Sequence, residues 1–326
     1  MKLPLRHPAQ NGNAFRGVRP LLRRLRRVVD MDAEEQSLEM LRSCRICPRE
    51  CGADRLAGEA GFCGAGSGAK VAAVSVHHGE EPPISGTGGS GTVFFSHCNM
   101  RCLFCQNYPI SQLGVGRDLS VEELGDELLR LQRKGAHNVN FVTPTPHVPQ
   151  LIASVGWARR KGLVIPIVYN TNGYESLETL AQLEGVVDIY LPDMKYRSTG
   201  LAEKLSGTPD YVVRNERAVA EMVRQAGPLS VGEDGIALKG VLIRHLVLPG
   251  RVRETEGVLA YIRETYGPEF PLSLMGQYFP AWRAATAAGL GRKLMEEEYE
   301  EAVRAAQRLG LENVYIQETE CPSELT

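Results

Sequence analysis

No apolar run in this 326-residue sequence approaches the roughly 20 residues that a membrane-spanning helix requires. The sequence also lacks an excess of either charge, because 37 lysines and arginines stand against 39 acidic residues and the net charge is −2. Nucleic acids and acidic membranes attract basic surfaces, so this balance argues against both as partners. We therefore expect neither a membrane nor a nucleic acid to be the main target.

The eight cysteines lack the arrangement of a disulfide-stapled secreted domain. They fall into a group of four, a group of three and the single Cys321, which is how metal ligands cluster in a sequence. We expect no secretory signal peptide, and thiolate ligands require a reducing compartment. The sequence thus predicts a cytoplasmic protein in which Cys321 is inert.

Three segments follow one another along the chain. Residues 1–36 form a basic N-terminal extension, to which we assign no function. Residues 37–88 hold the four-cysteine group, followed by a polar hinge around Glu80 and Glu81. Residues 89–326 are long enough for a barrel-type enzyme domain.

In this last segment, short apolar runs alternate with helical patterns, which predicts parallel strands joined by crossover helices. Ser120 and Glu123 form a capping box at the first helix. The expected strands are 92–96, 138–143, 165–169, 186–191, 241–248, 272–277 and 314–317, and the expected helices are 120–134, 148–161, 175–183, a pair over 198–226, 255–265 and 295–309. The predicted fold class is α/β, with six βα units and a small N-terminal cysteine-rich module.

Polar residues gather where these strands end, which is where parallel barrels place their reactive groups. Arg244 and His245 are neighbours in the fifth strand, so one faces the barrel interior, and we expect it to be Arg244. The candidate site residues after the second, third and fourth strands are Thr143 and Thr145, then Asn170, Thr171 and Asn172, then Asp193 and Lys195.

Directly after the first strand, Cys98, Cys102 and Cys105 have the spacing C-x3-C-x2-C. Thiolates are the usual ligands of iron–sulfur clusters, and a four-iron cluster has four iron corners. Three cysteines leave one iron open to a small molecule. One alternative is a zinc site completed by His97, and another is three unrelated buried cysteines. The close spacing and the polar neighbours favour the cluster.

This cysteine run, with an aromatic residue before its last cysteine, resembles the cluster motif of the radical S-adenosylmethionine (SAM) superfamily. The resemblance implies a partial (β/α)6 barrel and a [4Fe-4S] cluster on Cys98, Cys102 and Cys105. It implies that the open iron binds the amino and carboxylate groups of SAM. It further implies that an electron from a donor such as flavodoxin or ferredoxin cleaves SAM to a 5′-deoxyadenosyl radical.

The strand-end motifs resemble those of the glycyl-radical-enzyme activating group, which includes pyruvate formate-lyase-activating enzyme. A narrower resemblance, to a related group with no settled substrate, extends over residues 40–320 and includes 79–86, 105–111, 190–196 and 244–250. The activating group uses a D-T-N-G and a D-x-K motif around SAM's carboxylate and a monovalent cation. This implies a cofactor-binding role for Thr171, Asn172, Asp193 and Lys195.

Two positions depart from that group. Asn170 stands where the group has aspartate, which removes one carboxylate from the cation site. The segment 143–146 reads Thr-Pro-Thr-Pro in place of the G-G-E-P run that grips SAM's amino group. Thr143 and Thr145 remain candidates for hydrogen bonds to SAM, and Arg244 is a candidate for SAM's carboxylate or a substrate anion.

The four-cysteine group has the spacing C-x2-C-x3-C-x11-C over Cys44, Cys47, Cys51 and Cys63. Four thiolates complete a tetrahedral site, which suits a structural zinc ion or an electron-transfer cluster. Both interpretations of this second metal site stay open at this stage.

The sequence therefore predicts a radical SAM enzyme. In the first hypothesis its target is a glycyl radical enzyme, and in the second a small molecule or a nucleic acid. The third hypothesis is a non-catalytic iron–sulfur or zinc protein.

Overall fold

The computed structural model describes residues 37–316, so the basic extension and Cys321 lie outside the described residues. The strands are β1 (Ala69–His77), β2 (Ser90–Phe95), β3 (Arg117–Leu119), β4 (Val139–Val142), β5 (Ile167–Thr171), β6 (Ile189–Pro192), β7 (Ser230–Val231), β8 (Ala237–Val241), β9 (Ile243–Leu246), β10 (Leu272–Met275) and β11 (Val314–Ile316). The α-helices are α3 (Pro82–Ser85), α4 (Tyr108–Ser111), α5 (Val121–Arg133), α6 (Val148–Arg160), α7 (Leu177–Leu183), α8 (Thr199–Ser206), α9 (Tyr211–Ala226), α10 (Val252–Tyr266) and α11 (Glu296–Arg308).

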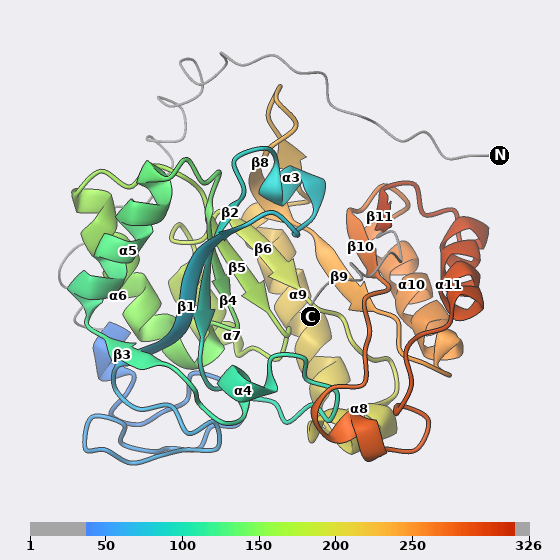
Figure 1. Ribbon diagram of the computed structural model, residues 1–326, viewed down its shortest axis with the longest axis horizontal. Helices are drawn as coiled ribbons and strands as arrows, with labels where there is room; N and C mark the ends of the chain where they lie inside the picture. Colours follow the sequence, from blue (N-terminus) through green and yellow to red (C-terminus); the bar gives the residue numbers. More distant parts are fainter. Residues whose placement is uncertain (1–36, 317–326) are drawn as a thin grey trace, which may run out of the picture.

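The strands form a mainly parallel, curved layer (Figure 1). One sheet has the order β3-β1-β2-β4-β5-β6-β8-β7, and a second has the order β11-β10-β9. An isolated bridge between Asp193 and Arg244 connects β6 to β9 and so joins the two sheets. Helices follow each of the parallel strands β2, β4, β5, β6, β9 and β10, which confirms the predicted α/β class with six βα units.

The sheet begins earlier than the boundary expected at residue 89. Strand β1 pairs antiparallel with β2, with Val74 opposite Val93. Along β1, buried and more exposed residues alternate in the way of a strand with one covered face. The expected hinge segment therefore contributes a strand to the barrel sheet.

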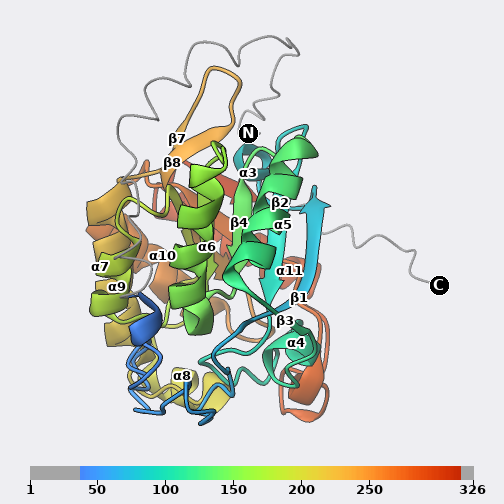
Figure 2. The same ribbon diagram turned by 90° about the vertical axis from the view of Figure 1, so that its left-hand side faces the viewer.

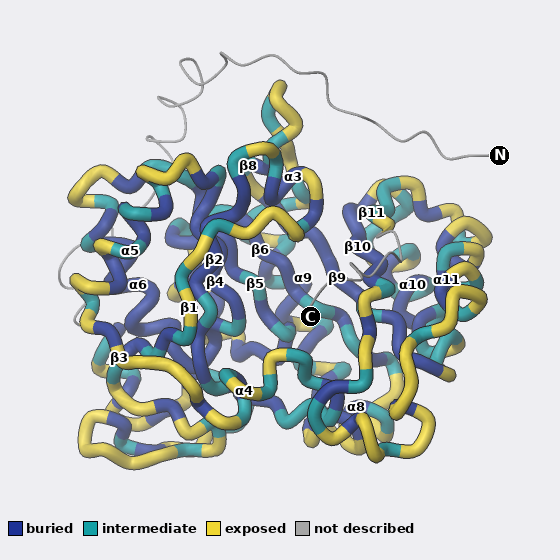
Figure 3. The backbone as a smooth tube through the Cα atoms, viewed as in Figure 1, coloured by how far each residue is buried: buried dark blue, intermediate teal, exposed yellow. Residues whose placement is uncertain are grey.

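The main hydrophobic core lies between the strands and the helices that cover them. Phe95 and Phe141, on neighbouring strands, have ring centroids 5.7 Å apart, and those of Tyr169 and Tyr190 lie 6.0 Å apart. All four side chains are fully buried beneath helices, whose outer faces are exposed (Figure 3). Helix α5 begins at the predicted capping box of Ser120.

The two ends of the barrel differ. The parallel strands end on the side of α4 and α8, where the cysteine-rich module also lies, whereas α3 lies at the opposite end (Figures 1 and 2). The cluster loop and the four-cysteine module therefore meet at one end of the molecule.

Glu80 and Glu81, just before α3, fill the barrel interior at the other end. The Arg244 guanidinium donates to both oxygens of Glu81, each at 2.8 Å, and also to Glu80. The Asn140 amide donates to Glu80 Oε1 at 3.2 Å. Burial alone would raise the pKa of Glu81, but the guanidinium lowers it below its ordinary value. This segment is thus a charged plug that depends on Arg244.

We expect the substitution Arg244→Met to reduce the free energy of unfolding by about 3–5 kcal/mol, because it leaves buried carboxylates without their cation. The depressed pKa of Glu81 stabilises the wild-type fold above the unfolded pKa of this residue. Without Arg244 the pKa rises, so the variant's deficit should be larger at pH 8 than at pH 5. Thermal unfolding at both pH values measures this.

The matched control is Arg224→Met, since Arg224 is 56% exposed in its pairs with Glu184 and Glu221. Exposed pairs contribute little to stability because solvent screens them, so this variant should unfold close to the wild type. An Arg244→Met deficit no larger than that of the control would contradict the role of the plug.

Candidate functional site

The loop after β2 brings Cys98, Cys102 and Cys105 together, with a polar group against each sulfur. The Asn172 amide and the backbone N–H of Met100 donate to Cys98 Sγ at 3.3 and 3.4 Å. The other two contacts are Ser206 Oγ to Cys102 Sγ at 3.0 Å and Ser111 Oγ beside Cys105 Sγ, also at 3.0 Å. Groups that hydrogen-bond to ligand sulfurs tune and hold a metal centre.

Cys98 and Cys102 are strongly biased toward their protonated form. Burial raises the pKa of Cys98 to about 12 and that of Cys102 to about 11. At neutral pH these groups keep their protons unless a metal displaces them, since metals bind the thiolate. A bound metal would supply the positive charge that stabilises these two sulfurs as thiolates.

The geometry argues against the zinc site that His97 would complete. His97, the proposed fourth zinc ligand, points to the module, with Nδ1 3.1 Å from the Cys63 carbonyl. Three thiols near one another, each with its own polar contact, match a cluster whose irons take one thiolate each.

Two residues beside the site have backbone conformations that L-amino acids seldom adopt. His97, directly before Cys98, has φ 72°, and Thr143, directly after β4, has φ 56°. A β-branched residue at positive φ is a strained exception that the surrounding structure must hold in place. Here the Thr143 N–H donates to the Asn170 carbonyl at 3.0 Å, and the His97 N–H donates to the Ile110 carbonyl at 2.9 Å. Such strain is typical of functional loops.

Asp193 and Lys195 lie next to the cysteine loop, as expected. The Lys195 ammonium pairs with the Asp193 carboxylate, and both side chains are largely buried, at 15% and 21% exposed. Burial alone would lower the pKa of Lys195, but Asp193 and the thiols of Cys102 and Cys105 raise it above its ordinary value. A fixed ammonium thus stands beside the cluster ligands.

The residues after β5 divide between the two faces of the strand. Side chains alternate along a strand, and Tyr169 belongs to the core beneath the helices, so Asn170 faces the barrel interior. Asn172 reaches Cys98 Sγ and also donates to Asn99 Oδ1 at 2.8 Å. Thr171 lies on the helix-covered face with Tyr169. Of the expected group, Asn170 and Asn172 are therefore the ones on the side of the cysteine loop.

Glu175 is a buried site residue that the sequence analysis missed. Its Oε1 accepts hydrogen bonds from Thr145 at 2.6 Å, from Tyr169 at 3.2 Å and from Thr171. Its Oε2 has no hydrogen-bond partner, and burial raises the pKa of Glu175 to about 7. The carboxylate absent from segment 143–146 is thus supplied to that loop from the next one. An acid directly before the helix-capping Ser176 was the only local signal for it.

Arg244 faces the interior, as expected, and His245 faces α10, where its Nε2 lies 2.9 Å from Thr255 Oγ1. The carboxylates that Arg244 meets are those of Glu80 and Glu81. The guanidinium is 10% exposed and already paired, because the plug occupies the space in front of it. This position makes Arg244 a structural cation and corrects the expectation that it meets SAM's carboxylate or a substrate anion.

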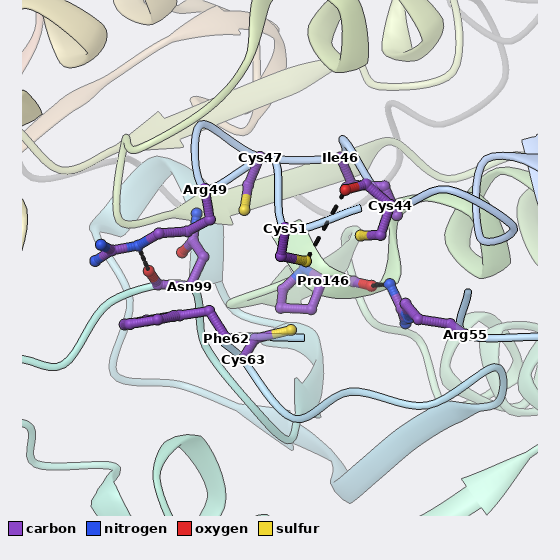
Figure 4. Close-up of a pocket in the computed structure, with 10 residues that line it drawn as sticks. All are labelled: Cys44, Ile46, Cys47, Arg49, Cys51, Arg55, Phe62, Cys63, Asn99 and Pro146. Atoms are coloured by element: carbon purple, nitrogen blue, oxygen red, sulfur yellow. Dashed lines mark hydrogen bonds between the residues drawn. The ribbon is translucent and has the colours of Figure 1, made fainter. Parts of the chain in front are cut away.

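The four cysteines of the module line one pocket (Figure 4). Its walls include the apolar side chains of Phe62 and Pro146, and Asn99 of the cluster loop. Burial raises the pKa of Cys47 to about 12, so this thiol keeps its proton at neutral pH unless a metal displaces it. Because Asn99 directly follows Cys98 in the chain, the four-cysteine pocket lies next to the cluster loop.

Three comparisons bear on the identity of this site. Residues 92–195 match the family model of the radical SAM superfamily, a span that runs from within β2 to Lys195. This match supports membership of the radical SAM superfamily. The uncharacterised protein MJ0674 of Methanocaldococcus jannaschii is 29% identical over 291 residues, which cover 86% of this chain and 79% of that protein. A second protein of that organism, MJ0808, is 26% identical over 250 residues, which cover 70% of this chain and 68% of that protein.

Among solved structures, the FeFe-hydrogenase maturase HydG from Carboxydothermus hydrogenoformans has a TM-score of 0.50 at 16% identity. The match covers 70% of this chain and 52% of HydG, so the chain spans about half of HydG's length. This likeness supports the radical SAM barrel as the fold. The radical SAM family implies a [4Fe-4S] cluster and SAM, and the donor set of the cysteine loop fits that cluster.

In the described part of the chain, no helix has the length and apolar character needed to cross a bilayer.

The buried carboxylate makes stability depend on pH. The pKa of Glu175 is about 7 in the fold and near 4.5 when exposed, so the folded protein holds the proton of this carboxyl more tightly than the unfolded chain does. The stability that this proton contributes is therefore lost as the pH rises from the unfolded pKa through 7. We expect the wild type to lose about 3 kcal/mol more than Glu175→Gln between pH 5 and pH 8. Urea unfolding of both proteins at several pH values measures the difference.

Glutamine keeps the acceptor oxygen but does not titrate, which makes it the matched control for the hydrogen bonds. Parallel stability curves for the two proteins across this range would contradict the buried ionisation.

Proposed function

We propose that the protein binds SAM at the open iron of a [4Fe-4S] cluster on Cys98, Cys102 and Cys105 and cleaves it to a 5′-deoxyadenosyl radical. The single observation that carries this is the group of three neighbouring thiols, each with a polar contact to its sulfur, beside the Lys195 ammonium. When bound, the cluster supplies the electron and the open coordination position.

The chain's own residues hold and shield the substrate. Lys195 offers its charge to SAM's carboxylate, while Asp193 keeps the ammonium in place from the other side. Asn172 sets the orientation of Cys98 through its amide. The Thr143 side chain stands at the end of β4, where its strained backbone fixes the loop that faces SAM. Thr145 and Thr171 act indirectly, by ordering this loop through Glu175.

We further propose that the radical abstracts hydrogen from a glycine of a partner polypeptide, as in glycyl-radical-enzyme activation. Apolar side chains on loops that flank the cluster loop support a macromolecular target: Leu113 is 60% exposed, Val115 57% and Phe279 46%. Gln106 of the cluster loop donates to the Gln277 carbonyl at 2.8 Å, which places the segment of Phe279 beside it. Exposed apolar side chains that gather in one region are typical of partner surfaces.

The anaerobic reaction with SAM and dithionite tests the function. We expect 5′-deoxyadenosine from the reconstituted wild type and none from Cys102→Ala, which loses one of three cluster ligands. Cys321→Ala is the control, because it leaves both cysteine groups intact. Production that persists in Cys102→Ala would refute cleavage at this site.

The same reaction, run with co-purified protein, tests the target. A glycyl radical signal in electron paramagnetic resonance (EPR) on a partner chain supports activation. Hydrogen transfer from a small molecule or a nucleic acid into 5′-deoxyadenosine would refute it in favour of the second hypothesis.

Lys195→Met tests the ammonium separately from the cluster. A charge-assisted hydrogen bond contributes about 1.5–3 kcal/mol, so we expect SAM binding to weaken by about 10- to 100-fold. Iron content should stay unchanged. The control is Lys161→Met, whose ammonium lies 3.6 Å from the Trp157 ring centroid at the far end of α6. Equal SAM affinities in all three proteins would contradict the assignment.

A further inference from the structure

We infer that the four-cysteine pocket holds a second iron–sulfur cluster and that this cluster passes electrons to the site at Cys98, Cys102 and Cys105. The first half of the inference concerns metal identity alone, and the relay half rests on the proposed function.

The place of the pocket, more than the number of its thiols, points to a cluster. Cys44, Cys47, Cys51 and Cys63 line a single pocket (Figure 4), and four thiolates complete either a zinc site or a four-iron cluster. A structural zinc ion needs no fixed position beside a second cysteine group, whereas a cluster that exchanges electrons with that group does.

The pocket is tied to the loop of the first site by contacts of three side chains. Arg49 Nε donates to the Asn99 carbonyl at 3.1 Å, and Arg101 donates to the Phe62 carbonyl. His97 Nδ1 lies 3.1 Å from the Cys63 carbonyl. Because each contact joins one loop to the backbone of the other, the two cysteine groups are held at a constant separation, which electron transfer requires.

A single residue bridges the two sites. Asn99 lines the four-cysteine pocket and is bonded along the chain to Cys98. Its Oδ1 lies 3.8 Å from Cys98 Sγ and accepts the Asn172 amide, which also reaches that sulfur. One route from the pocket to the first site therefore passes through this asparagine, by covalent bonds and by a hydrogen bond.

The pocket also has an outer side. Cys51 is exposed, so an electron can enter the pocket there. Arg49 and Arg55 line the pocket, and their charge offsets the negative charge of a thiolate-bound cluster. The electron source is a low-potential one-electron protein of the flavodoxin or ferredoxin class. It loses one electron to the second cluster, which returns to its starting state when that electron moves to the first site and cleaves SAM.

Metal analysis of the full chain, purified and reconstituted without oxygen, tests the first half. We expect about eight irons per chain and no zinc in the wild type, and about four irons both in Cys51→Ser/Cys63→Ser and in Cys98→Ala/Cys102→Ala. EPR of the second double variant should retain a cluster signal that SAM does not alter. About four irons with one zinc in the wild type, and loss of the zinc in Cys51→Ser/Cys63→Ser, would overturn the inference.

The relay is tested by comparing two reductants with the Cys51→Ser/Cys63→Ser variant. We expect 5′-deoxyadenosine formation to fall by an order of magnitude or more with reduced flavodoxin. With dithionite, which is small enough to reach the first site directly, formation should stay near the wild-type rate. A SAM-dependent change in the EPR signal of the remaining cluster shows that the variant is folded.

Equal loss with both reductants, or no loss with either, would overturn the relay. A wild type that cleaves no SAM with either reductant would instead refute the proposed function. The iron and zinc contents would still decide separately whether the pocket holds a cluster.

Discussion

A line of alternating charges through the barrel interior supports both its ends. Glu81 pairs with Arg244, Arg244 also lies in the field of Asp193, and Asp193 pairs with Lys195. Lys195 in turn interacts with the thiol of Cys102. None of these groups would be stable in the interior alone, because a buried charge without a partner costs several kcal/mol. The plug at one end and the cluster loop at the other therefore share one electrostatic arrangement. This series of charges ends at the Lys195 ammonium, which lies beside the thiol of Cys102. An anionic group of a substrate would pair with this ammonium.

Much of this arrangement is predictable, because it depends on local patterns. The alternation of apolar runs and helical segments predicts which residues end each parallel strand, and the strand ends of a barrel meet on one side. Asp193, Lys195 and Asn172 could therefore be placed near the cysteines without coordinates. Since neighbours on a strand face opposite sides, Asn170 and Thr171 cannot both line the interior.

The parts that could not be predicted come from distant segments. Arg244 and Glu81 are separated by 163 positions and Cys102 and Ser206 by 104, and nothing in either local sequence marks the partner. An inward arginine near a SAM motif suggests a ligand for SAM until the plug is seen. Glu175 is hidden for a different reason: a glutamate before a capping serine is usually solvated, and only the packing of three hydroxyl groups around it shows that it is buried.

The module and the barrel are best understood as one rigid unit. Ser176 and Thr179, at the start of α7, both donate to the Ile46 carbonyl inside the module, at 3.1 and 2.7 Å. The buried Arg55 donates from the module to the Pro146 carbonyl at 2.7 Å, on the loop that follows β4. Satisfied buried hydrogen bonds of this kind are costly to break, so the module cannot swing away from the barrel as a tethered domain would. A structural metal would need no such exact placement beside Asn99. A fixed separation matters for electron transfer between the two cysteine groups, because the transfer rate depends strongly on distance.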